Sequence, residues 1–313
     1  MMQATECHQW EPSDFEFVAT LQEAPRNHGC VNLMKSIARG GGFVAVKQMS
    51  NSWVTTGPEE FMRNYPDENE KPWMDIAVSK YLHSRGFSHV CEPLGVFRDI
   101  KNTLVVSSFA TEGDLFSWID SSKCPGMERD GIMASLMRQT FAAVRWMHDL
   151  GMAHRDLSLE NILVTKQDYG LAVKLIDFGM ASAERHCSGP CGKKSYMAPE
   201  MHEDTVYDAF LTDAFSLGVV LFTLVAGNYP WNSTKPGLCS MFGYATGHGL
   251  RAYLRRRKFA TGRRLADVLA EPLVELLEGL LEAEPQRRLS LGEQCWAGAP
   301  RPSVWDLQWL AAA

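Results

Sequence analysis

The sequence predicts an α+β fold with two lobes, a small β-rich N-terminal lobe and a larger, mainly α-helical C-terminal lobe. Short β-branched runs separated by turns dominate the first third of the chain, whereas apolar residues recur at helical spacing in the rest. A chain of 313 residues is long enough for two lobes that each bury a core. Its composition, 45% hydrophobic and 22% charged, is that of a globular protein and argues against wholesale disorder.

In the N-terminal part, the run Phe43–Lys47 predicts a strand that is entered through a glycine-rich turn at residues 39–42, as in a hairpin. Residues 48–72 are polar and contain three prolines, so we expect a long loop there. A helix is expected over residues 73–82. The β-branched run at residues 103–107 predicts a further strand.

Helical patterns dominate the C-terminal part. Apolar residues at helical spacing over residues 133–147 predict a helix that Gly151 can terminate. Two short strands are expected at residues 161–165 and 172–178. A leucine stripe at residues 273–281 predicts an amphipathic helix whose apolar face belongs to the core rather than to a binding surface.

The net charge of −6 argues against a broadly basic nucleic-acid-binding protein, and we expect no nucleic-acid partner. The longest apolar run lies within residues 217–227, which is shorter than the roughly 18 residues that a membrane span needs. We therefore expect no membrane span. The N-terminal residues contain no apolar stretch of the kind found in signal peptides, so a cytoplasmic location is expected.

The eight cysteines are scattered and none belongs to a Cys-x-x-Cys pattern, which favours reduced thiols in an intracellular protein. His186, Cys187 and Cys191 are the cluster that could bind zinc. They supply three ligands without an obvious fourth, so we interpret them as unpaired side chains in a loop.

The strongest functional signal is a series of four short motifs. In chain order they are VAVK at residues 44–47, HRDLSLEN at 154–161, DFG at 177–179 and APE at 198–200. In form, order and spacing they resemble the strand lysine, catalytic loop, metal-binding triplet and activation-segment terminator of the eukaryotic protein kinase family. The YMAPE sequence at residues 196–200 is more similar to the serine/threonine branch than to tyrosine kinases.

The resemblance covers about residues 20–296 and implies the bilobal fold of that family. It implies an N-terminal extension at 1–19, an N-lobe at about 20–107, a hinge at about 108–112, a C-lobe at about 113–296 and a C-terminal tail at 297–313. In the tail, Trp305 and Trp309 are spaced as on one helix, which predicts a short helix that packs back onto the domain.

Phosphoryl transfer depends on positioning and charge neutralisation more than on covalent catalysis. The cofactors implied are ATP and Mg²⁺, an ion that prefers hard oxygen ligands. By resemblance, Asn161 and Asp177 hold the metal, and Asp156 orients the substrate hydroxyl and accepts its proton. Lys47 binds the α- and β-phosphates as a point charge.

The resemblance also implies a nucleotide site and several structural positions. Apolar contacts to adenine come from Val31, Ala45 and Leu163, backbone contacts from Phe109 and Ala110, and a ribose contact from Asp114. Structural or regulatory roles fall on His154, Arg155, Phe178, Glu200, Asp213, Arg288 and Ser188. Among these, Asp213 fixes the catalytic-loop backbone, Glu200 pairs with Arg288, and Ser188 is the best-placed phosphate acceptor for Arg155.

The chain departs from the family pattern at three places. The glycine loop falls on residues 24–29, where Gly29 is the one pattern glycine that remains. Asp75 stands where the family has the glutamate partner of Lys47. Ser158 replaces the usual lysine of the catalytic loop, and Lys193 replaces a usual threonine of the activation segment.

We interpret the last pair as a positional exchange with catalytic consequences. In this hypothesis, Lys193 reaches across to the γ-phosphate while the Ser158 hydroxyl bonds near Asp156. The alternative is a solvated Lys193 beside a merely tolerated Ser158.

The function implied is an ATP-dependent transferase, a protein kinase that phosphorylates serine or threonine in a protein substrate. The alternative is a pseudokinase that binds nucleotide or acts as a scaffold, which the poor glycine loop and Asp75 favour. A small-molecule kinase is disfavoured by the APE motif together with Asp213. Seven basic residues between Arg251 and Arg264 are interpreted as a solvated face, with docking of an acidic partner as the alternative.

Overall fold

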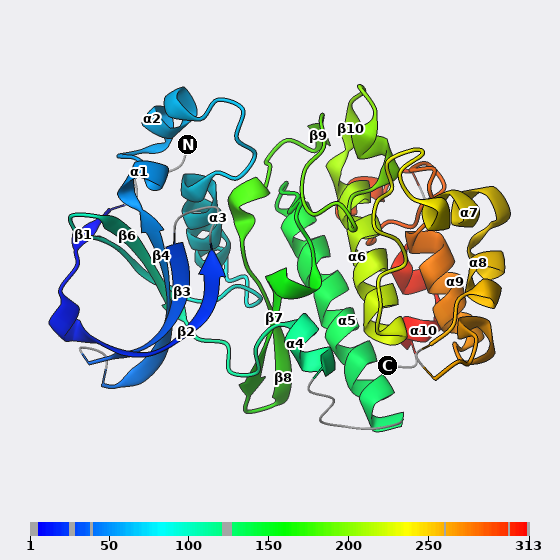
Figure 1. The fold of residues 1–313 in the computed structure, drawn as a ribbon, viewed down its shortest axis with the longest axis horizontal. Coiled ribbons are helices and arrows are strands. Elements are labelled where there is room, and N and C mark those ends of the chain that lie inside the picture. The colour runs from blue at the N-terminus through cyan, green and yellow to red at the C-terminus, as the bar shows by residue number, and fades with distance from the viewer. Residues whose placement is uncertain are drawn as a thin grey trace. The chain divides into compact units, whose positions relative to one another are not determined.

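The computed structural model describes residues 6–24, 29–37, 40–120, 127–259, 261–299 and 301–311. The chain divides into an N-terminal unit, Met1–Thr111 with Lys174–Met180, and a C-terminal unit, Glu112–Val173 with Ala181–Ala313. The first is built around a β-sheet and the second is mainly helical (Figure 1). The predicted α+β class is therefore confirmed.

The N-terminal unit contains a six-stranded sheet with strand order β1-β5-β6-β4-β3-β2. All neighbouring strands are antiparallel except β1 and β5, which pair in parallel. The strands are β1 (His8–Gln9), β2 (Phe15–Ala24), β3 (Gly29–Ser36), β4 (Gly42–Ser50), β5 (Pro93–Arg98) and β6 (Asn102–Ser108).

Side-chain alternation along β4 positions the lysine of the first motif. Val44 and Val46 are buried in a core cluster with Trp10, Leu104 and Val106. Because successive side chains of a strand point to opposite faces, Ala45 and Lys47 lie on the other face of the sheet.

The prediction of a loop at residues 48–72 is wrong. Strand β4 continues to Ser50 and is followed by two short helices, α1 (Asn51–Val54) and α2 (Pro58–Asn64), which lead to α3 (Pro72–Ser84). Two of the three prolines, Pro58 and Pro72, start helices, where the missing N–H costs nothing. Val54 and Phe61 are fully buried, which anchors the two short helices.

The C-terminal unit consists mainly of helices. They are α4 (Leu115–Asp120), α5 (Met127–Asp149), α6 (Ala209–Ala226), α7 (Ser240–His248), α8 (Leu250–Arg256), α9 (Glu271–Leu280) and α10 (Gln308–Ala311). Two small antiparallel pairs join them, β7 (Ile162–Gln167) with β8 (Gly170–Leu175), and β9 (His186–Cys187) with β10 (Tyr207–Asp208). The predicted strand at residues 172–178 is too long, because Asp177 has a positive φ of 65° and Phe178–Met180 is a 3-10 helix.

Helix α6 is the core element of the C-terminal unit. The Asp208 side chain accepts a hydrogen bond from the Phe210 amide at its start, and Gly227 ends it in the left-handed conformation. With 18 residues and a mean hydropathy of 2.0, it is long and apolar enough to cross a membrane. The apolar segment Ala209–Ala226 is thus longer than the run at residues 217–227 that the sequence analysis identified. Of its residues, 89% are buried in the structure, as is usual for the core helix of a globular protein.

The leucine stripe lies on α9, where Leu273, Leu276, Leu277 and Leu280 are buried as predicted. The prediction of one helix through Trp305 and Trp309 is wrong. A 3-10 helix (Val304–Asp306) carries Trp305, and α10 carries Trp309, because a capping box closes the first turn and Leu307 is extended. The tail nevertheless packs on the unit, since the Trp305 indole donates to the Leu291 carbonyl at 2.6 Å.

Candidate functional site

Lys47 lies in an acidic environment within the N-terminal unit. Its Nζ is 2.7 Å from Asp75 Oδ2 on α3 and 3.3 Å from Asp177 Oδ1. Burial alone would lower the pKa of the Lys47 ammonium, but the carboxylates of Asp177 and Asp75 outweigh it and raise the pKa. Lys47 is therefore cationic and held by its partners, as a phosphate-binding group needs to be.

Asp75 forms a second contact that ties α3 to the DFG motif. Its Oδ1 accepts a hydrogen bond from the Phe178 amide at 2.9 Å, and the Lys71 amide donates to the Gly179 carbonyl at 2.9 Å. The first turn of α3 is thus fastened to the DFG backbone. This close approach explains how an aspartate, one methylene shorter than glutamate, reaches Lys47.

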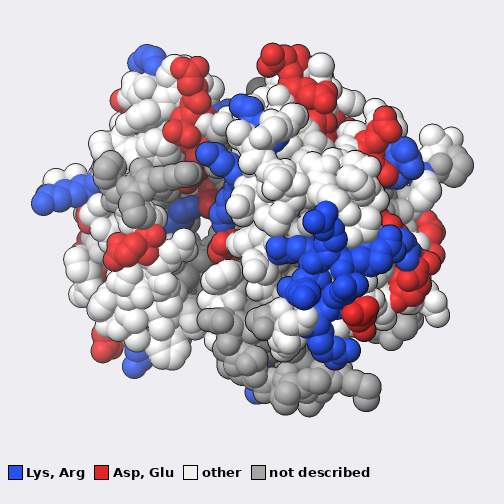
Figure 2. Space-filling model, turned by 45° about the vertical axis from the view of Figure 1, so that its right-hand side comes forward, with Lys and Arg blue, Asp and Glu red and all other residues white. Residues whose placement is uncertain are grey.

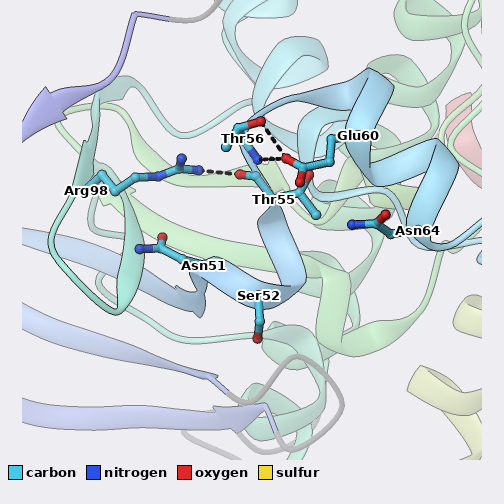
Figure 3. A pocket seen from close by; sticks show the side chains of 7 residues that line it. All are labelled: Asn51, Ser52, Thr55, Thr56, Glu60, Asn64 and Arg98. Atoms are coloured by element: carbon cyan, nitrogen blue, oxygen red, sulfur yellow. Dashed lines mark hydrogen bonds between the residues drawn. The ribbon is translucent and has the colours of Figure 1, made fainter.

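The short helix α1 after β4 also contacts α3. The Trp73 indole at its first turn donates to the Val54 carbonyl at 2.7 Å. Beside this contact, the Arg98 guanidinium donates to the Thr55 carbonyl at 2.6 Å, and Thr55 has a positive φ of 63° (Figure 3). A pocket of about 490 Å³ opens here, lined by the polar residues Asn51, Ser52, Thr55, Thr56, Glu60, Asn64 and Arg98.

The HRDLSLEN motif forms a compact hydrogen-bonded loop in the C-terminal unit. The Asn161 amide group donates to the Asp156 carbonyl at 2.7 Å and to Asp156 Oδ2 at 3.1 Å. These bonds orient Asn161 so that its side-chain oxygen is available as a ligand. The Asn161 amide oxygen in the C-terminal unit and the Asp177 carboxylate in the N-terminal unit are each hard donors of the kind that Mg²⁺ prefers.

Asp213 on α6 holds the catalytic-loop backbone. Its carboxylate accepts hydrogen bonds from the His154 amide at 2.7 Å and the Arg155 amide at 2.8 Å. Arg155 has a positive φ of 67°, so these bonds stabilise a conformation that a non-glycine residue rarely adopts.

A buried histidine completes this network, and the sequence analysis did not identify it. His148 Nε2 lies 2.9 Å from Asp213, and its Nδ1 lies 2.8 Å from Glu293. Burial would lower the pKa of His148, but the hydrogen bonds and charges of Asp213 and Glu293 raise it to about 9. No local pattern could have found this contact, because Glu293 is 145 residues away in the chain.

Lys193 lies directly beside Ser158. Its Nζ is 2.7 Å from Ser158 Oγ and 3.0 Å from Glu160 Oε2, while its backbone amide donates to Asp156 Oδ1 at 3.1 Å. Burial would raise the pKa of Glu160, but the Lys193 cation lowers it. Ser158 and Lys193, two of the positions at which the chain departs from the family, are thus in direct contact.

Gly192 makes this approach feasible, and the sequence analysis did not single it out. It has a φ of 86°, and a Cβ there would lie 2.7 Å from the Arg155 carbonyl oxygen and 3.1 Å from Asp156 Oδ1. A side chain at this position would push the activation segment away from the catalytic loop.

The APE glutamate forms a bidentate ion pair. Arg288 Nη1 and Nη2 lie 2.6 and 2.9 Å from the two carboxylate oxygens of Glu200, and the guanidinium is buried. The remaining donors of Arg288 bond to the carbonyls of Leu211, Glu282 and Ala283, at 2.9, 2.8 and 3.2 Å, so the buried guanidinium is fully satisfied.

The residues expected around adenine fall in two groups. Val31 on β3, Ala45 on β4 and the segment Phe109–Ala110 after β6 belong to the N-terminal unit. Asp114 and Leu163 belong to the C-terminal unit, where they pair as an isolated bridge.

Of the glycine loop, residues 25–28 lie outside the described residues. Its last glycine is required by the sheet, because a Cβ at Gly29 would lie 2.0 Å from the Gln48 carbonyl oxygen.

The phosphate-acceptor position remains a prediction. Ser188 is exposed, and the neighbouring Gly189 carbonyl accepts a hydrogen bond from Tyr207, whose hydroxyl is also the acceptor for Arg155 Nη2 at 3.0 Å. The Nε of Arg155 is buried without a hydrogen-bond partner in the described part of the chain. Among the described residues, no group of three or more His, Cys, Asp or Glu side chains is arranged to hold a metal ion.

Comparison with known proteins identifies the family. A family model described as "Protein kinase domain" matches residues 27–297. The chain belongs to the protein kinase family.

Individual relatives are protein kinases by name, and two of the following three are named serine/threonine-protein kinases. The chain is 29% identical to Testis-specific serine/threonine-protein kinase 5 of Mus musculus, over 80% of this chain and 68% of that protein. It is 31% identical to CBL-interacting protein kinase 22 of Oryza sativa subsp. japonica, over 74% of this chain and 48% of that protein. Serine/threonine-protein kinase PRR2 of Saccharomyces cerevisiae is 26% identical over 62% of this chain, which corresponds to 28% of that longer protein.

Proposed function

We propose that this chain is an active serine/threonine protein kinase that transfers the γ-phosphate of ATP to a protein hydroxyl. The observation that carries the proposal is the contact of Lys47 with Asp75 and Asp177, at 2.7 and 3.3 Å. Family members need this charge arrangement in place for transfer. The chain therefore retains a lysine–carboxylate pair although the family glutamate is replaced.

Each charged group then has one task in the reaction. Lys47 orients the α- and β-phosphates. The oxygen of the substrate hydroxyl attacks the γ-phosphorus, and Asp156 accepts the proton that this hydroxyl loses. The new oxygen–phosphorus bond forms while the bond from the γ-phosphorus to the ADP oxygen breaks. Asn161 and Asp177 are the residues that would hold Mg²⁺, and the ion would supply neutralisation of the phosphate charge.

Lys193 is proposed to supply the remaining cation. In the family a lysine of the catalytic loop neutralises the transferred phosphoryl group, and here that position is Ser158. The 2.7 Å contact between Lys193 Nζ and Ser158 Oγ supports an exchange of the two positions. Glu160, 3.0 Å away, keeps Lys193 on the catalytic-loop side.

The second candidate function is that of a pseudokinase, favoured by the glycine loop of residues 24–29 with its single pattern glycine. Purified protein with labelled ATP, Mg²⁺ and generic protein substrates separates the two functions, beside an Asp177→Asn control. Label on phosphoserine or phosphothreonine, absent in the control, supports the kinase. Nucleotide binding without transfer under all conditions supports the pseudokinase.

A further inference from the structure

A basic patch covers one face of the C-terminal unit. It lies at the end of α8 and on the hairpin that follows, and the sequence from residue 251 to 264 contains no acidic residue. Figure 2 shows Lys and Arg side chains gathered in one continuous group on the face that carries α8. We define the basic patch as Arg255, Arg256, Arg257, Lys258, Arg263 and Arg264.

A backbone hairpin places several of these cations close together. Phe259 donates from its amide to the Arg263 carbonyl at 2.9 Å, and Lys258 pairs with Arg264 across the hairpin. Gly262 has a positive φ of 84° at the turn. Like charges placed opposite each other on paired strands are destabilising, so this arrangement does not serve the stability of the hairpin.

Two members of the patch are engaged by the protein itself. Arg256 lies over the Tyr244 ring at 4.5 Å from its centroid, and Arg257 donates to the Tyr229 carbonyl at 3.1 Å. In contrast, Arg251 just before the patch is neutralised by Glu271 and Glu278, at 2.6 and 2.7 Å. In these ion pairs the positive charge of Arg251 is balanced by carboxylates of the same unit.

The other four members have no such compensation. Arg255, Lys258, Arg263 and Arg264 are exposed, and none forms an ion pair with a residue that the structure describes. The chain as a whole has a net charge of −6, so this positive surface is a local exception. A local potential of one sign attracts a partner of the opposite sign and raises its rate of association.

We propose that the basic patch docks an acidic, Asp- or Glu-rich segment of a partner protein. Five of its six members are arginines, whose planar guanidinium matches a carboxylate with two parallel hydrogen bonds. The contact is one of binding alone, so it does not depend on phosphoryl transfer.

The surroundings of the patch favour a peptide over a nucleic acid or a membrane. The Tyr244 ring is occupied by Arg256 on one side and stacks with His248 at 4.2 Å, so it offers no platform for a base. The apolar side chains of α8, Leu250, Tyr253 and Leu254, are buried and cannot insert into a bilayer.

The test is fluorescence anisotropy of a labelled octaglutamate peptide with the full chain. We expect binding that weakens as ionic strength rises, and that weakens at least about tenfold in the double variant Arg263→Glu/Arg264→Glu. The matched control, Arg85→Glu/Arg287→Glu, makes the same change of net charge at exposed positions outside the patch and should bind as the wild type does. Thermal unfolding shows that each variant is folded.

Three outcomes would overturn the proposal. They are no octaglutamate binding at low ionic strength, equal losses in patch and control variants, and patch-dependent binding of duplex DNA or phosphatidylserine vesicles without binding of octaglutamate. The Asp177→Asn variant should bind octaglutamate like the wild type. Loss of transfer and loss of docking are therefore separate results, and failure of one proposal does not imply failure of the other.

Discussion

The Lys193 ammonium lies 2.7 Å from the Ser158 hydroxyl, so two of the residues that depart from the family pattern are in direct contact. Lys193 comes from the activation segment and Ser158 from the catalytic loop. Ser158 is fully buried, whereas the side chain of Lys193 is 41% exposed. The Lys193 side chain is therefore partly accessible, while its backbone amide donates to Asp156 Oδ1.

The positional exchange predicts a non-additive double-mutant cycle. Lys193→Thr should lower kcat about a hundredfold, the scale of losing one transition-state charge contact. Adding Ser158→Lys should recover much of the loss, because it returns the cation to the catalytic loop. Steady-state kinetics of the four proteins of the cycle give the coupling free energy. Near-wild-type turnover of Lys193→Thr would refute the exchange, and Lys194→Thr, at the next position, serves as the control.

Asp75 is predicted to act through charge rather than shape. Asp75→Asn keeps an oxygen that can accept from the Phe178 amide, but removes the carboxylate that holds Lys47. We expect kcat/KM for ATP to fall about tenfold to a hundredfold, with little change in thermal stability. Asp75→Ala, which loses both contacts, should also lower stability. Unchanged kcat/KM in Asp75→Asn would show that Lys47 needs no partner on α3.

The small side chain of Ser107 predicts sensitivity to enlarged ATP-competitive inhibitors. Ser107 pairs with Ala45 across β6 and β4, and the family commonly has a bulky residue at this position before the hinge. The unmodified protein should bind inhibitors that carry an added aromatic group, and Ser107→Met should block them. Competition binding measures both proteins. Equal affinities would show that the small side chain at position 107 does not determine access for the added group.

Because Glu200 and Arg288 form a buried ion pair, we expect the loss in free energy of unfolding to be non-additive between single and double variants. Glu200→Leu leaves a buried guanidinium without its counter-charge and should cost about 3–5 kcal/mol in free energy of unfolding. The double variant Glu200→Leu/Arg288→Met removes both charges and should be less destabilised than the sum of the single changes. Denaturant unfolding of the set tests this, and additive losses would contradict it.

Residues inside contiguous motifs could be predicted from the sequence. Lys47, Asp156 and Asp177 occur in short strings whose order and spacing carry the information, and the lysine and the DFG aspartate indeed meet in the N-terminal unit. Lys193 and Ser158 were singled out for the same reason, since each is a deviation at a fixed place in such a string. The sequence placed the Ser158 hydroxyl near Asp156, whereas in the structure that hydroxyl contacts Lys193.

Contacts without a local signal could not be predicted. Helix α1 has four residues, which is too few for a helical pattern to be recognised in the sequence. Helix α2 begins at Pro58, and prolines in a polar segment predict a loop. The contact of His148 with Glu293 joins residues 145 positions apart. The need for glycine at position 192 arises from the approach of another segment, so only the folded structure shows it.

The His148 network predicts a defined dependence of stability on pH. The folded-state pKa of about 9 exceeds the ordinary value of 6.5, so His148 contributes most below pH 6.5 and its contribution is lost as the pH rises through about 9. Asp213 and Glu293 have lowered pKa values, and the stability they contribute is lost in acid instead. The free energy of unfolding should therefore fall by a few kcal/mol between about pH 6.5 and 9. His148→Gln, which can still donate one hydrogen bond but carries no charge, should be less stable at pH 6.5 and should lose most of this slope. Denaturant unfolding at several pH values measures both proteins, and parallel pH profiles would show that His148 is neutral in the folded protein.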